Sequence, residues 1–60
     1  MENAAYEMVK TMEKLLADND SVTAWNLQSA FVRLHNAQPL NSPEREAMAA
    51  VWNKAMNKWH

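Results

Sequence analysis

The chain has 60 residues, of which six are basic and seven acidic, and its formal net charge is −1. At this length it holds one domain with a small core, because about 60 residues bury only about 60% of the surface that the unfolded chain exposes. The lack of cysteine excludes disulfides and thiolate metal sites, and the near-zero charge predicts no general attraction to nucleic acid or anionic membranes. We therefore expect a single helical domain over 1–60, stabilised by packing, self-association or both.

Composition also indicates where such a protein works. No apolar run approaches the ~20 residues of a membrane span, and the N-terminal residues lack the basic and apolar blocks of a signal peptide. We expect a soluble, cytoplasmic protein. A designed bundle would normally carry glycine at its helix ends, and this chain has none. We interpret it as a natural protein, of the kind found among bacterial and phage accessory proteins, that runs from Met1 to His60 without a tag.

The first predicted helix covers about residues 2–18, where apolar side chains recur every three or four positions. It should end near Asn19, because asparagine is the best substitute here for glycine in the left-handed position after a helix. On its polar side, Lys10 is spaced to pair with Glu7 or Glu13, each pair contributing about 0.2–0.5 kcal/mol. The apolar stripe consists of Ala5, Met8, Val9, Met12, Leu15 and Leu16.

A second helix is predicted over about residues 21–37. Either Asp20 or Ser21 can cap it with a side-chain oxygen. Pro39 ends it, because proline lacks an N–H and disfavours helical dihedral angles in the residue before it. In the connection that follows, we expect Leu40 to fold back over one end of the core.

This second helix has two apolar stripes, centred roughly 180° apart on a helical wheel. A central helix that touches both neighbours would explain the second stripe, and so would an exposed patch at a protein interface. Both interpretations remain open at this point. The inner stripe consists of Ala24, Leu27, Ala30, Phe31 and Leu34, and the second of Val22, Trp25 and Val32, with Ser29 among them.

The third predicted helix covers about residues 43–58 and has the clearest start in the chain. Ser42 is the expected N-cap, Pro43 occupies the first helical position, and Glu44 and Glu46 complement the helix dipole. At the other end, Lys54, Lys58 and His60 place positive charge near the C-terminus. The apolar stripe consists of Met48, Val51, Trp52, Ala55 and Trp59, with Met56 at its border.

Three amphipathic helices joined by short connections predict an all-α, up-down-up three-helix bundle. The alternative is a splayed arrangement that closes only when two chains associate.

Few side chains in this sequence favour catalysis. His35 is the only internal histidine, and it falls beside Gln28 and Arg33 rather than on the apolar stripe, which is typical of a surface position. Without glycine, the chain cannot form a phosphate-binding glycine loop or an EF-hand. We therefore expect no enzyme, no cofactor, no metal site and no small-molecule substrate.

A small DNA-binding transcriptional regulator is the alternative function. The third helix offers Asn53, Lys54, Asn57 and Lys58 as possible base or phosphate contacts. No helix carries a concentrated positive charge, however, and the connection over 36–41 exceeds the three- or four-residue turn of a helix-turn-helix. The sequence therefore favours another kind of partner.

Our main hypothesis is a non-enzymatic protein that acts by protein–protein contact, as a homodimer or as an adaptor or inhibitor of a larger partner. Tryptophan is dense in the chain, with three in 60 residues, and the second helix has an additional apolar stripe. In a two-fold dimer Trp25 would lie near the axis and Arg33 at the rim. The predicted interface consists of Val22, Trp25, Ser29, Val32, Arg33 and Trp59.

Overall fold

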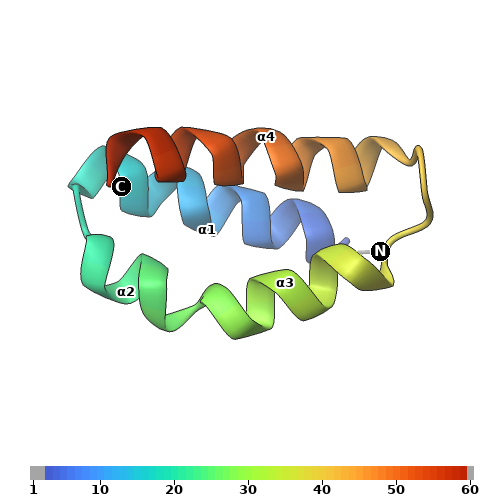
Figure 1. Ribbon diagram of the computed structural model, residues 1–60, viewed down its shortest axis with the longest axis horizontal. Helices are drawn as coiled ribbons and strands as arrows, with labels where there is room; N and C mark the ends of the chain where they lie inside the picture. The colour runs from blue at the N-terminus through green and yellow to red at the C-terminus, as the bar shows by residue number, and fades with distance from the viewer. Residues whose placement is uncertain (1–2, 60) are drawn as a thin grey trace.

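The computed structural model describes residues 3–59, which form four helices: α1 (Ala4–Asp18), α2 (Ser21–Asn26), α3 (Gln28–Ala37) and α4 (Pro43–Lys58). The short helices α2 and α3 follow one another along one side of the molecule, so the chain packs as three antiparallel rods (Figure 1). This arrangement confirms the predicted all-α three-helix bundle. A single chain already has a buried hydrophobic core.

Local capping explains both ends of α1. The Asn3 side chain accepts a hydrogen bond from the backbone N–H of Ala5 at 3.0 Å. At the other end, Asn19 takes the left-handed conformation with φ 56°, as predicted. The expected pair between Lys10 and Glu7 is present at 3.7 Å on the exposed side. The predicted start of this helix at residue 2 lies outside the described residues.

Asp20 is the N-cap of α2, one of the two residues that the sequence offered for this role. Its carboxylate accepts hydrogen bonds from the Thr23 backbone N–H at 3.1 Å and from the Thr23 hydroxyl at 2.7 Å. The hydroxyl bond is the larger cause and the backbone bond the smaller cause of a lowered pKa for Asp20, because both favour the charged form. The cap is therefore strongest when Asp20 is ionised.

This geometry predicts a pH dependence. Because the folded pKa of Asp20 is lower than its unfolded pKa, the stabilisation is complete above the unfolded value and is lost as the pH falls through the folded one. In a carboxyl NMR titration, Asp20 should titrate at lower pH than in the denatured chain. Thr23→Val should raise its midpoint, whereas Thr11→Val, on α1, should leave it unchanged. An unmoved midpoint in Thr23→Val would contradict the assigned cause.

The predicted helix over 21–37 is wrong in one respect, because it breaks at Leu27 into α2 and α3. The Leu27 N–H is shared between two carbonyls of α2 at 3.1 Å each, and its backbone angles are φ −87° and ψ −2°. In a straight helix, Trp25 and Phe31 would point about 120° apart. In the folded chain both rings contact Trp52 of α4. We attribute the break to this shared packing partner.

A tight turn leads into α4. The Ser42 N–H donates to the Pro39 carbonyl at 3.2 Å, and Asn41 has a positive φ of 66°. Leu40 lies at the apex of this turn with 77% of its surface exposed, so the expectation that it covers the core is wrong. The turn geometry directs it outward, because an apex residue faces away from the chain segments that the turn joins.

The start of α4 is as predicted, with Pro43 in its first turn. The Ser42 hydroxyl oxygen accepts a hydrogen bond from the Arg45 backbone N–H at 3.1 Å. Ser42→Ala should therefore lower the free energy of unfolding by about 1 kcal/mol, measured by urea denaturation. Ser29→Ala is the matched control, because Ser29 is exposed within α3 and caps nothing in the described structure. Equal stability of the two variants would show that this cap contributes little.

The hydrophobic core lies between α1 and α4 and is closed by α2 and α3 (Figure 1). Of the predicted inner stripe, Ala24 and Phe31 are buried, whereas Ala30 is exposed. Ala30 directly precedes Phe31 in α3 and points about 100° away from it, so it lies at the edge of the buried side. The buried residues are Ala5, Met12, Leu15, Ala24, Phe31, Met48, Val51 and Ala55.

Candidate interaction surface between α3 and α4

Three aromatic rings meet where α2 and α3 face α4. The Trp52 ring stacks on Phe31, with centroids 4.8 Å apart and an interplanar angle of 28°. It also packs against Trp25 in an edge-to-face arrangement at 5.7 Å and 87°. Such pairs stabilise by about 0.5–1.5 kcal/mol beyond the area that they bury. Trp25 is thus a packing partner of α4 within the chain, which supports the interpretation of a central helix for that residue.

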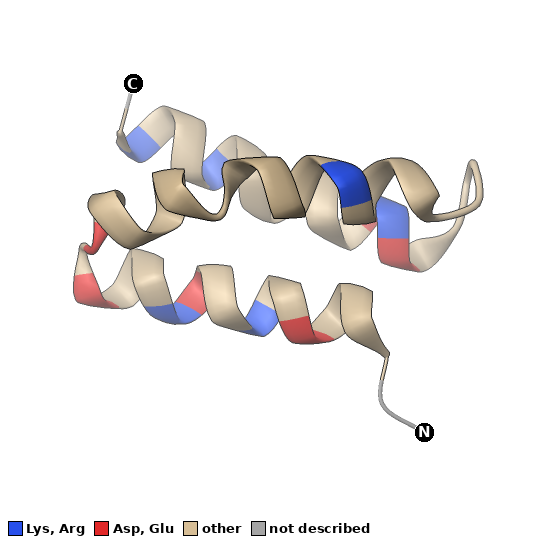
Figure 2. Cartoon of the chain, turned by 90° about the horizontal axis from the view of Figure 1, so that it is seen from below, with Lys and Arg blue, Asp and Glu red and all other residues tan. Residues whose placement is uncertain are grey.

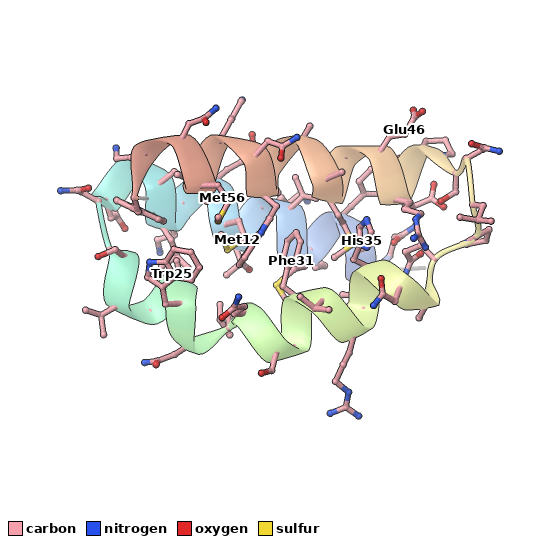
Figure 3. The ribbon with its side chains drawn as sticks, in the orientation of Figure 1. Met12, Trp25, Phe31, His35, Glu46 and Met56 are labelled. Atoms are coloured by element: carbon pink, nitrogen blue, oxygen red, sulfur yellow. The ribbon has the colours of Figure 1, made fainter. Side chains whose placement is uncertain are left out.

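Beside these rings, a pocket of about 160 Å³ opens between α3 and α4. Figure 3 shows Phe31 and His35 extending from α3 toward α4 around this space. Four of the six lining side chains are apolar, and none is a carboxylate, a lysine or an arginine. The pocket is lined by Phe31, Val32, His35, Ala49, Trp52 and Asn53.

The volume of this pocket decides what fits into it. Pockets for drug-sized ligands measure about 300–1,000 Å³, which is well above 160 Å³. An apolar cavity of about 150 Å³ is known to admit a benzene-sized molecule. The pocket therefore matches one apolar side chain of a partner better than a cofactor.

Two exposed apolar side chains flank the pocket. Val32 stands at its mouth with 43% of its surface exposed. Met56 lies one helical turn beyond Trp52 on α4, is 40% exposed, and projects toward the space between α4 and α2–α3 (Figure 3). We call the six pocket residues together with Met56 the α3–α4 face.

The structure places the predicted interface residues in different environments. Val32 lines the pocket, whereas Val22 is 71% exposed on α2. Ser29 and Arg33 are exposed on α3. Trp59 is half-buried after the end of α4, and its ring N–H donates to the Asn19 side-chain oxygen at 3.0 Å. Val32 therefore lines the pocket beside the aromatic cluster, Trp25 belongs to the cluster, and Trp59 lines a small gap together with Trp25 and Trp52.

The sequence pattern did not mark Ala49, marked Asn53 only as a possible DNA contact, and placed Met56 at the border of the apolar stripe. Ala49 and Asn53 lie one turn apart on α4, beside Trp52. In the sequence, only the position of Met56 at the edge of the apolar stripe indicated that this side of α4 contributes to the candidate surface. Which side of α4 faces α3 depends on how the helices pack, and the sequence pattern of one helix does not contain that information.

The positive side chains are spread over the molecule. Arg45 donates to the carbonyls of His35 at 3.3 Å and Gln38 at 3.1 Å, where α3 ends. Lys58 donates to the Leu16 carbonyl at 3.0 Å near the end of α1. These groups stabilise helix C-termini. Figure 2 shows basic and acidic positions distributed over the helices of the described chain.

Among residues 3–59, no cluster of three or more histidine, aspartate, glutamate or cysteine side chains is arranged to bind a metal ion. Over the same range, every helix is too short or too polar to cross a membrane. No protein-family model, curated protein or solved structure matches this chain.

Proposed function

We propose that this protein acts by non-covalent protein–protein contact through the α3–α4 face, as a non-enzymatic cytoplasmic protein. The observation that carries the proposal is the mostly apolar pocket of about 160 Å³ beside the Trp25–Trp52–Phe31 cluster. Interface hot spots cluster in well-packed pockets of this kind and are rich in tryptophan. The contact would join two copies of the chain or attach it to a larger protein as an adaptor or inhibitor.

The pocket is large enough for one buried side chain of a partner to contribute substantially to the binding free energy. Full burial of one large aliphatic or aromatic side chain contributes about 1.5–3 kcal/mol. Each 1.4 kcal/mol corresponds to about a tenfold change in affinity. A single anchoring side chain would thus strengthen binding roughly 10- to 100-fold. This difference is enough to distinguish a specific partner from proteins that bind non-specifically.

The DNA-binding alternative has less support. Arg45 and Lys58 donate to backbone carbonyls at helix ends, and Lys10 pairs with Glu7. Phosphate contacts supply most non-specific affinity for DNA, and the bonds of these three cations within the chain leave fewer cations to contact phosphates. We therefore carry protein contact forward as the proposed function.

Photocrosslinking in cells that express the protein tests this proposal. A photoreactive aromatic residue at position 53, on the rim of the pocket, should give discrete protein adducts. The same residue at position 22, which is exposed on α2 and outside the pocket, is the matched control. Adding Val32→Glu should abolish the adducts from position 53, because it places a charge at the mouth of an apolar pocket.

Each outcome of the photocrosslinking experiment supports or contradicts protein contact through the α3–α4 face. Adducts from position 53 that disappear with Val32→Glu would support protein contact through this face. Equal labelling from positions 53 and 22 would contradict it. Adducts that are sensitive to nuclease rather than to protease would favour the DNA-binding alternative.

A further inference from the structure

We infer that α3 is a separate unit of local unfolding, which detaches from the bundle and loses its helix while α1, α2 and α4 stay packed. Two hydrogen bonds from the Arg45 side chain to the end of α3, which we call the Arg45 bridge, oppose this opening. The inference goes beyond the proposed function. Its test uses the chain alone, so its failure would leave the proposed function standing.

Both ends of α3 are interruptions in the helical backbone, and Figure 1 shows the first of them between α2 and α3. At this interruption the Leu27 N–H is shared between the carbonyls of Thr23 and Ala24, at 3.1 Å each. After α3, Gln38 has extended backbone angles and Asn41 has a positive φ of 66°. Residues at the ends of elements absorb changes in dihedral angle, so α3 can move without bending a continuous helix.

The attachment of α3 to the core is small. Phe31 is its only fully buried residue in the described structure, and Leu34 packs half-buried against the core. The other buried residues lie on α1, α2 and α4, and Trp25 of α2 packs against Trp52 of α4. Detachment of α3 therefore removes one buried side chain from the core and leaves the contacts among the other three helices in place.

Open space flanks α3 on both sides. The pocket of about 160 Å³ lies between α3 and α4, and a groove of about 560 Å³ lies between α3 and α1. Leu27 and Leu34 line this groove opposite Met8 of α1. Tightly packed interiors contain few voids larger than a water molecule. The side chains beside these spaces lack neighbours on one side, so α3 gains less dispersion energy than a fully packed helix.

The Arg45 bridge fastens the end of α3 that is farthest from Leu27. Nη1 of Arg45 donates to the carbonyls of His35 at 3.3 Å and Gln38 at 3.1 Å. Hydrogen bonds from a charged donor are stronger than bonds between neutral groups. Arg45 also lines a second pocket, of about 230 Å³, which shares His35 and Ala49 with the first. The bridge thus holds α3 against α4 beside the candidate interaction surface.

A detached α3 would lose its helical hydrogen bonds. It has 10 residues, and isolated helices shorter than about 12–15 residues are marginal in water. Its amides would therefore exchange with solvent during each opening. Phe31, Val32 and His35 of α3 form half of the lining of the 160 Å³ pocket, so this pocket exists only while α3 is docked.

Native-state hydrogen exchange followed by NMR tests the inference on the wild-type chain. Under conditions in which exchange reports the opening equilibrium, the α3 amides should exchange at least about tenfold faster than the central amides of α1 and α4, after correction for intrinsic rates. Low concentrations of urea should accelerate the α3 amides less, because detachment exposes less surface than global unfolding. Equal protection and equal urea dependence in all three helices would overturn the inference.

Two substitutions on α4 provide a matched pair. Ala50 is exposed within α4, and glycine in a helix interior shifts the folding equilibrium by about fourfold to fivefold relative to alanine. Because α4 stays folded when α3 detaches, Ala50→Gly should accelerate the central amides of α1 and α4 by this factor and leave those of α3 unchanged.

Arg45→Met removes the bridge and keeps a good helix former, and the Ser42 cap is retained because it uses the Arg45 backbone N–H. The bridge is broken both when α3 is detached and when the chain is unfolded. Arg45→Met should therefore accelerate exchange about tenfold in all three helices. Unchanged exchange in this variant would overturn the role of the bridge.

A molecule that unfolds only as a whole would respond differently to Ala50→Gly, because every amide would then exchange through the same unfolded state. Acceleration of the α3 amides by the same factor as those of α1 and α4 would overturn the inference. The wild-type comparison decides between the two cases even if a variant fails to fold.

Discussion

Phe31→Ala is expected to unfold a large fraction of the molecules at 25 °C. Phe31 is 2% exposed and stacks on Trp52 at 4.8 Å, so its removal leaves a cavity at the junction of α3 and α4. Truncation of a buried phenylalanine costs about 3–5 kcal/mol. A domain of this size has a total stability of about 3–9 kcal/mol, at 0.05–0.15 kcal/mol per residue. Urea denaturation followed by circular dichroism measures the loss.

Val32→Ala is the matched control for this prediction. Val32 is the next residue on α3, but 43% of its surface is exposed, so its truncation removes less buried area. We expect a loss of less than about 1 kcal/mol from the smaller apolar burial. If Phe31→Ala proved as stable as Val32→Ala, the assignment of Phe31 to the core would be wrong.

Met48→Ala should have the second-largest effect, with a loss of about 2–5 kcal/mol in the free energy of unfolding. Met48 on α4 and Met12 on α1 are the largest side chains that are fully buried in the described structure. Truncation of Met48 leaves its neighbours without contacts on one side, and the packed helices collapse only partly into the space. The midpoint of urea denaturation should fall without a change in its slope, because the surface exposed on unfolding stays nearly the same.

Met48→Leu tests whether the loss of stability comes from the missing side-chain volume or from the missing sulfur. Leucine nearly conserves the volume and lacks sulfur, and such substitutions usually cost less than about 1.5 kcal/mol. We therefore expect Met48→Leu to be much more stable than Met48→Ala. Similar midpoints for the two variants would mean that α1 and α4 close over the missing side chain and that the core is more adaptable than a tightly packed bundle.

The helix ends were predictable from the sequence because short-range interactions determine them. Asn19 adopts the left-handed conformation and Ser42 caps α4, as predicted. The helix α3 ends at Ala37, two residues before Pro39. This is expected because proline disfavours helical dihedral angles in the residue before it. In each case the bond or dihedral restriction involves residues within four positions. The apolar repeat predicted three amphipathic helical rods, and three such rods predict a bundle.

Tertiary structure alone decided the break at Leu27, the direction of Trp25 and the composition of the α3–α4 face. Helical periodicity assigns faces on a straight helix, and on such a helix Trp25 and Phe31 point apart. Trp52 of α4 contacts both rings in the folded chain, and the backbone bends between them. The pocket also needs α3 and α4 side by side, because each contributes half of its lining. A surface formed by two helices depends on their relative rotation, which packing of the whole core sets and no single segment encodes.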